Sequence, residues 1–383
     1  MNTPSVRRFD LDWMRILAIL SVFVFHSLRF FNYDDWHVKN LHQYILPSDI
    51  INFMDQWMMP FIFVISGASL YYALGKGKML NTAGKFVKDK VLRLLVPLLF
   101  NAFSLLFFQV YLERITHGQF TGSMLEFIPH YFDGIFGIGM GNFPLFGMHL
   151  WYLVVLFAFS VVLLPVFMLL KGRIGGRVLG WVTKAAALPG GIYVLALLIL
   201  LSWKLIDSNG ILGFDAFNWN LGVYMSFFLF GFVVMSSEKL QRSIQQLRWV
   251  SLALAIGMSA WFILTNEHDD LVAWSVILAF LGFGMRYLNV NKPVLKYASE
   301  AVLPFYILHQ TVLLCVGYFV VQLAIPDLLK WAIIAVGSLA IIMGTYEYLV
   351  RRNNVLRFLF GMKIMKKAAQ PAAVPAMPMP EKI

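Results

Sequence analysis

Four ionisable residues lie in or beside the first long apolar run of the chain, and their spacing suggests a functional site. Asp12, Arg15, His26 and Arg29 are separated by intervals that place them on one face of a helix. Ionisable groups inside a bilayer are costly unless they face a partner or a wet cavity, so they commonly mark a site. On such a helix Arg15 and His26 would lie about 16 Å apart, because each residue rises about 1.5 Å.

The residue types suggest proton transfer and anion binding. An imidazole has an ordinary pKa of about 6.5, so His26 can act as a general base. A guanidinium binds phosphate through paired hydrogen bonds, and Arg93, just before another apolar run, could lie beside Arg15. Two alternatives stay open. Asp12, Arg15 and Arg29 could reach the membrane interface from the helix ends, and Arg93 could simply anchor a basic connecting segment.

Other apolar runs carry polar residues that could support the same site. Ser66 precedes a glycine where a helix or a ligand can come close, and His309 lies in the middle of a later run. His149 begins one run, and Glu300 stands at the edge of another. Ser66 and His309 each have a structural alternative. Ser66 suits a helix crossing, and His309 suits a hydrogen bond between helices. No H-E-x-x-H or C-x-x-C pattern occurs, so we expect neither a metal ion nor a permanently bound cofactor.

These residues need membrane-spanning helices to position them. The chain of 383 residues is 60% hydrophobic and 13% charged, and its mean hydropathy is +0.72. Soluble domains are about 45–50% apolar and about 25% charged, so the composition excludes an ordinary soluble protein. We therefore predict an all-α integral membrane protein of about ten transmembrane helices. The apolar runs lie at residues 13–31, 52–75, 93–112, 149–170, 190–206, 217–236, 248–265, 270–288, 300–322 and 330–350.

The net charge of +11 is explained by topology rather than by a nucleic-acid partner. Lysine and arginine concentrate in alternate connecting segments, most densely at 76–93 and after 351. Under the positive-inside rule, these segments and both termini are cytoplasmic. The other segments are rich in acidic residues, which disfavours phosphate-rich partners outside. The sequence predicts a transmembrane unit over 1–352, followed at 353–383 by a cytoplasmic basic segment and a disordered tail.

Five motifs follow one another along nearly the whole chain. They are R-F-D-L-D-W-M-R with F-H-S (8–27), F-V-I-S-G (63–67), V-L-R-L-L-V-P (91–97), H-L-W-Y-L (149–153) and S-E-A-V-L-P-F-Y-I-L-H-Q (299–310). Together they resemble the acyltransferase type 3 family of membrane acyltransferases. A further run, D-W-H-V-K-N (35–40), is similar to the glucan-biosynthesis-C branch of that family.

The resemblance implies a membrane O-acyltransferase of the bacterial inner membrane. It implies transfer of an acetyl or succinyl group from cytoplasmic acyl-CoA to a hydroxyl of a glycan or glycolipid on the external side. The family's first-span arginine and histidine correspond to Arg15 and His26, and its third-span arginine corresponds to Arg93. Arg15 and Arg93 would then hold the phosphates of acetyl-CoA or succinyl-CoA. The thioester would reach His26, which acts as general base or forms a transient acyl-histidine.

The remaining polar residues are expected to support this site. Asp12 can pair with Arg15, while Ser66, His149, Glu300 and His309 are candidates for supporting or acceptor-side positions. The competing hypothesis is a transporter or flippase for a polar solute or glycolipid, which would use the same charged residues as its pathway. A structural membrane subunit is a third possibility. The oligomeric state stays open, a homodimer included.

Overall fold

The computed structural model describes residues 7–75, 83–186, 188, 190–197, 200–202, 213–214, 219–265 and 270–365. The tail predicted to be disordered, beyond residue 365, lies outside the described residues, as do Lys76 and Lys78 of the basic segment. The described chain is helical, apart from isolated bridges near residue 140 and one antiparallel pair of two-residue strands, β1 (Gly213–Phe214) and β2 (Trp219–Asn220). The predicted all-α class is confirmed.

Five helices in the described chain are long and apolar enough to cross a membrane. Two further pairs of helices would each make one span that is bent at a short break, which raises the count to seven. The prediction of about ten spans is therefore not confirmed by helix length and composition. The five long helices are α1 (Phe9–Leu28), α2 (Ile45–Ala73), α12 (Glu238–Thr265), α14 (Pro293–Val320) and α15 (Asp327–Thr345) with its continuation η6 (Tyr346–Val350).

The two bent pairs occupy the third and fourth apolar runs. The first combines α3 (Ala83–Lys90), η2 (Val91–Leu95) and α4 (Val96–Ala102) with α5 (Leu105–Thr116), and its two halves meet at 43°. The second joins η3 (Met148–Leu150) and α7 (Trp151–Val162) to α8 (Leu164–Lys171) at 50°. Pro165 stands in the first turn of α8 and has no backbone N–H to continue the ladder of α7, which explains this bend.

The other apolar runs form shorter helices. The run at 190–206 contains η4 (Gly191–Ala196) and partly lies outside the described residues. The next runs form α11 (Leu221–Met235) and α13 (Asp270–Tyr287). Three more helices lie outside the apolar runs, namely α6 (Met124–His130), α9 (Arg173–Ala186) and α16 (Asn354–Leu359).

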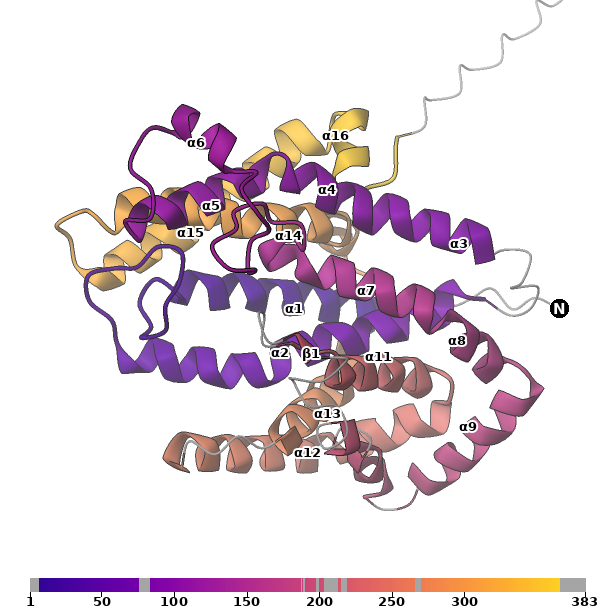
Figure 1. Cartoon of the computed structure of the whole chain (residues 1–383). Helices are drawn as coiled ribbons and strands as arrows, with labels where there is room; N and C mark the ends of the chain where they lie inside the picture. The colour runs from indigo at the N-terminus through magenta and orange to yellow at the C-terminus, as the bar shows by residue number, and fades with distance from the viewer. Residues whose placement is uncertain are drawn as a thin grey trace, which may run out of the picture.

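Helix α1 lies in the middle of the helical assembly. It packs against α2 on one side and against α14 and α15 on the other (Figure 1). Asp10 and Asp12 stand in its first turn, where the positive end of the helix dipole favours carboxylates. Arg8 pairs with the buried Asp10 at 2.7 Å and also donates to Gln241 at 2.8 Å. The start of α1 is therefore joined to α12.

Close packing of α2 on α11 depends on glycine. A Cβ atom at Gly67 would lie 1.9 Å from the Phe228 carbonyl oxygen, and one at Gly231 would lie 2.0 Å from the Val64 carbonyl oxygen. Neither position has room for a side chain. The small residues around Ser66 thus allow two helices to cross closely. This is one of the two alternatives that the sequence leaves open.

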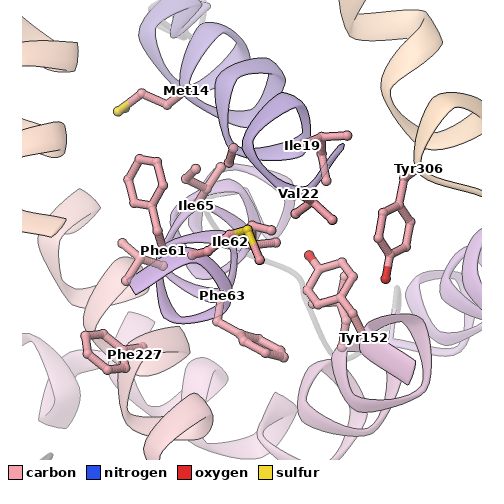
Figure 2. Packing of buried hydrophobic residues seen from close by; sticks show 14 of the residues in the cluster. Met14, Ile19, Val22, Phe61, Ile62, Phe63, Ile65, Tyr152, Phe227 and Tyr306 are labelled. Atoms are coloured by element: carbon pink, nitrogen blue, oxygen red, sulfur yellow. The ribbon is translucent and has the colours of Figure 1, made fainter. Parts of the chain in front are cut away.

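The buried side chains of α1, α2, α7, α11 and α14 form one apolar cluster. Figure 2 shows Ile19 and Val22 of α1 next to the rings of Tyr152 and Tyr306, which project from α7 and α14 into the same space. The two rings are 6.0 Å apart and nearly perpendicular. This point, where three helices meet, separates two polar regions of the interior.

Candidate active site

The first polar region is centred on two histidines from α1 and α14. His26 Nδ1 and His309 Nε2 are 3.0 Å apart, within hydrogen-bond distance. His309 Nδ1 lies 2.5 Å from the carbonyl oxygen of Tyr306, which can only accept, so this nitrogen carries the proton. In neutral His309 the Nε2 atom is then an acceptor, and His26 donates to it from Nδ1. The Nε2 lone pair of His26 has no hydrogen-bond partner among the described residues.

His149 lies beside this pair and is held in a fixed orientation. Its ring is 5.1 Å from that of His309. Nε2 of His149 donates to the Ile307 carbonyl oxygen at 3.3 Å, and Nδ1 accepts from the amide of Gln109 at 3.3 Å. His149 and His309 are both buried. The fold thus brings together His26, His149 and His309, which lie far apart in the sequence.

A chain of side-chain hydrogen bonds continues from His149 toward the loop that follows α1. Gln109 accepts from Gln310 Nε2 at 3.1 Å, and Gln310 Nε2 lies 3.1 Å from His37 Nε2. His37 Nδ1 donates to the carboxylate of Glu113. Gln310 is buried, and its Oε1 has no partner among the described residues. A hydrogen-bond donor from a substrate, such as a hydroxyl, would satisfy this oxygen.

The same loop places an aromatic ring over His26. Trp36 lies nearly parallel to the imidazole, with 6.1 Å between ring centroids and 17° between planes. Lys39 holds the loop in place by donating to the carbonyl oxygens of Arg29, Asn32 and Asp34. Burial lowers the pKa of Lys39 to about 8, and the nearby Arg29 acts in the same direction.

The second polar region begins at Arg15, near the start of α1. Arg15 Nη2 donates to Ser69 Oγ at 2.6 Å, and Nη1 lies 3.4 Å from Asp12 Oδ1. Asp12 makes a shorter contact with Arg7, at 2.8 Å, so it is shared between two guanidiniums. Arg15 borders a cavity of about 240 Å³ whose far wall includes Tyr152 and Tyr306. Ser66 also lines it and hydrogen-bonds to the Tyr152 hydroxyl at 2.5 Å.

A larger cavity of about 690 Å³ adjoins this inner cavity. Arg93 lines it from η2, a short π-helical turn of the kind that often occurs at functional sites. The Nε atom of Arg93 bonds to Asp89 at 3.0 Å, whereas its Nη atoms have no partner among the described residues. The cationic side chains around this outer cavity are Lys85, Lys90, Arg93 and Lys363.

The two cavities adjoin each other, since Ala73, Lys90, Leu94 and Leu303 line both. Arg93 lines the outer cavity, and Arg15, Tyr152 and Tyr306 line the inner one. The carbonyl of Tyr306 accepts from His309, the partner of His26. Arg15 and Arg93 thus line neighbouring cavities, and the histidines lie next to a tyrosine of the inner one.

Glu300 lies away from the histidines. It lines the outer cavity, and its carboxylate accepts from Arg357 at 2.5 Å. Glu300 and His309 are on the same helix but about 13 Å apart along its axis, because each residue rises about 1.5 Å. Glu300 therefore lies at the same end of the assembly as Arg93. Among the described residues, no group of three His, Cys, Asp or Glu side chains is arranged to hold a metal ion.

Comparison with known proteins identifies the family. A model of the family described as "Acyltransferase domain" matches residues 8–347. The chain belongs to this acyltransferase family. It is similar to Glucans biosynthesis protein C of Escherichia coli (strain K12), with 24% identity over 95% of this chain and 97% of that protein. The protein of the same name from Escherichia coli O9:H4 (strain HS) is similar to the same extent. No solved structure matches the chain.

These comparisons confirm the resemblance to the acyltransferase type 3 family and to its glucan-biosynthesis-C branch. Membership of the family supports transferase activity. Together with the apolar helices, it indicates a membrane location.

Several site residues were given no role from the sequence. Gln109 and Gln310 connect the histidines to the loop that follows α1, and Tyr152 and Tyr306 line the inner cavity. The glutamines carried a signal, since an amide within an apolar run needs a partner inside the protein. Tyrosines in apolar runs carry no such signal, because they are equally common at membrane interfaces.

Proposed function

We propose that this protein transfers an acyl group from cytoplasmic acyl-CoA to a hydroxyl of a glycan or glycolipid on the external side of the bacterial inner membrane. The observation that carries the proposal is that the cationic outer cavity adjoins an inner cavity lined by Arg15 and Tyr306, and that the Tyr306 carbonyl oxygen bonds to His309, the partner of His26. The cationic side chains of the outer cavity suit the negative charge of a nucleotide with several phosphates. A narrow, mainly apolar inner cavity fits the pantetheine arm.

The donor would lie along α1. Its phosphates would meet the Nη atoms of Arg93 and the guanidinium of Arg15, which bind phosphate oxygens through charge-assisted hydrogen bonds. Arg15 and His26 are about 16 Å apart on the continuous helix, a distance comparable to the extended pantetheine arm. Tyr152 and Tyr306 stand between the inner cavity and the histidines, so their side chains must move aside when the thioester advances.

The chemistry would take place at the unpartnered Nε2 of His26. This nitrogen accepts the proton of the acceptor hydroxyl as its oxygen attacks the thioester carbonyl carbon. The carbon–sulfur bond breaks, and the thiolate of CoA takes up the proton from the imidazolium. His309 would act as a positioning residue, because its acceptor nitrogen keeps the proton of neutral His26 on Nδ1. Gln310 Oε1 could accept a second hydroxyl of the acceptor.

Thermal stabilisation of the detergent-purified protein tests donor binding. Acetyl-CoA or succinyl-CoA at about 100 times its dissociation constant should stabilise the protein by about 2.7 kcal/mol. Arg15→Ala and Arg93→Ala should lose this shift, whereas Arg242→Ala, an exposed cation outside both cavities, should keep it. The thioester that stabilises more would identify the donor. Absence of stabilisation by either thioester in folded wild-type protein would contradict the proposal.

A second measurement separates binding from catalysis. His26→Ala should retain the thermal shift with acyl-CoA and lose transfer to an added glucan by about 10²- to 10⁴-fold. Release of CoA, followed with a thiol reagent, measures the turnover. Solute transport that depends on a proton gradient and needs His26, without any release of CoA, would instead favour a carrier.

A further inference from the structure

The segment from Asn354 to Lys363, here called the C-terminal hook, closes one side of the outer cavity. It consists of α16 and the turn that follows, and Gly361, Met362 and Lys363 line the cavity. The hydropathy of the sequence predicts that this segment lies outside the transmembrane unit. In the structure it packs against α4, and Phe360 contacts Phe100 with ring centroids 6.0 Å apart.

The hook is in direct contact with the helical turn that carries Arg93. Gly361 has a φ of +70°, a conformation in which glycine is strongly favoured. A Cβ atom at this position would lie 2.7 Å from the carbonyl oxygen of Arg93 and 2.8 Å from Leu303. A glycine is therefore required both by the backbone and by the close approach. The turn is placed where its next residues reach the cavity that Arg93 lines.

A buried arginine fixes the position of Lys363. Arg357 donates to the Lys363 carbonyl oxygen at 2.8 Å, to the Arg351 carbonyl oxygen at 3.0 Å and to Glu300 at 2.5 Å. The backbone on both sides of the hook and the start of α14 are thus held by one guanidinium. The ammonium group of Lys363 makes no hydrogen bond or ion pair among the described residues, and neither does that of Lys85, which also lines the cavity.

We propose that the C-terminal hook is part of the donor-binding site, with Lys363 and Lys85 as ligands of the nucleotide phosphates. This inference rests on the proposed function and deepens it. Its basis is that Lys85, Arg93 and Lys363 border one cavity of about 690 Å³, a size suited to a nucleotide. Asp89 and Glu300 also line the cavity, but they are paired with Arg93 and Arg357. The two ammonium groups without partners and the free Nη atoms of Arg93 leave a net positive charge there. Such a cluster favours a ligand with several phosphates.

Binding of CoA by the full-length protein in detergent tests the inference. Lys363→Ala and Lys85→Ala should each raise the dissociation constant about 10- to 150-fold, the usual effect of losing one charge-assisted hydrogen bond. Lys363→Glu should weaken binding further. Lys292→Ala is the matched control, because this exposed lysine precedes α14 and does not line the cavity. Pantetheine, which has no phosphate, should bind all variants equally.

The possible results separate the two proposals. If Arg93→Ala loses CoA binding while both lysine variants bind like wild type, the hook has no part in the site and the proposed function stands. If wild type does not bind CoA at all, the proposed function and this inference both fail. Phosphate of an anionic lipid could occupy the same cluster. Variants that lose stabilisation by phosphatidylglycerol yet bind CoA normally would therefore overturn the inference. The melting temperature without ligand should be unchanged in every lysine variant, since the ammonium groups of these lysines make no hydrogen bond or ion pair with the part of the chain that the structure describes.

Discussion

At the scale of single residues, His26 and His309 have distinct hydrogen-bonding positions. The Tyr306 carbonyl oxygen determines which nitrogen of His309 carries the proton, and His309 in turn orients His26. This leaves one nitrogen of His26 with a lone pair and without a partner. A general base needs such a nitrogen. A hydrogen bond from a second group also restricts the base to fewer orientations, which favours the reactive one.

His309 substitutions test this role. We expect His309→Ala to lower kcat about 10- to 100-fold, with a smaller change in KM for acyl-CoA, because the base is misoriented and the donor cavity is intact. His309→Gln should recover part of the loss, since its amide oxygen can accept from His26 Nδ1. Steady-state release of CoA measures both constants. An equal decrease of kcat in His309→Ala and His309→Gln would argue against a positioning role. So would a change in KM without a change in kcat.

At the scale of helices, the tight contact of α2 with α11 positions the wall of the inner cavity. Ser66 and Ser69 belong to the part of α2 that crosses α11, because Gly67 and Gly231 bring the two backbones together. Gly231→Ala should lower the melting temperature. The added methyl group would lie 2.0 Å from the Val64 carbonyl oxygen, and overpacking of this kind costs about 1–3 kcal/mol.

A matched substitution controls this experiment. Gly257→Ala in α12 adds a methyl group that meets no atom within 4 Å, and it should leave the melting temperature unchanged or raise it slightly, since alanine favours helix. Melting of both variants is followed by tryptophan fluorescence in detergent. If Gly231→Ala melts at the same temperature as Gly257→Ala, α2 and α11 can move apart without loss of stability.

The loop over His26 is attached to α5 by a pH-sensitive contact. His117 Nε2 lies 3.1 Å from Asp35 Oδ1, and His117 Nδ1 bonds to the Glu113 carbonyl oxygen. Burial lowers the pKa of His117, but these hydrogen bonds outweigh it, and the net pKa is raised above 6.5. A raised pKa means that the contact stabilises the folded loop fully below about pH 6.5 and is lost as pH rises through the folded value.

We therefore expect the loop at residues 32–44 to open more readily as pH increases above about 6.5. Hydrogen exchange, corrected for the intrinsic pH dependence of exchange, measures this opening. The variant His117→Gln removes the titrating group and should give opening that is independent of pH in this range. Persistence of the pH dependence in that variant would assign it to another group.

At the scale of the whole molecule, the basic end of the assembly and the histidine pair lie on opposite sides of the tyrosines. Arg93, Lys85 and Lys363 line the outer cavity, whereas the histidines lie close to the loop with Trp36. An enzyme that takes a donor from one side and an acceptor from the other needs this separation. The predicted orientation, in which both termini are cytoplasmic, would put the cationic outer cavity at the cytoplasmic end of the assembly.

Reporter fusions test that orientation. We expect green fluorescent protein to be fluorescent at either terminus and alkaline phosphatase to be inactive there, because both termini face the cytoplasm under the positive-inside rule. Phosphatase inserted after Gly118, in the loop beyond α5, should be active. Termini on opposite sides would require an odd number of spans and would contradict the prediction of about ten.

The sequence alone determined the class of the protein and the positions of its polar groups along each helix. Hydropathy is a sum over neighbouring residues, and the helical period is local, so the all-α class and the shared face of Arg15 and His26 needed no tertiary information. Helix lengths were less predictable. Breaks at Pro165 and near Phe103 divide apolar runs that read as continuous.

Only the tertiary structure decided which of these groups meet. His26 contacts His309 because α1 packs against α14, and Glu300, on that same helix, meets Arg357 at the other end. Contacts between residues far apart in the chain depend on how whole helices pack, which local patterns do not encode. The C-terminal hook reaches Arg93 for the same reason, since a glycine contact with a distant backbone leaves no periodic signal in the sequence.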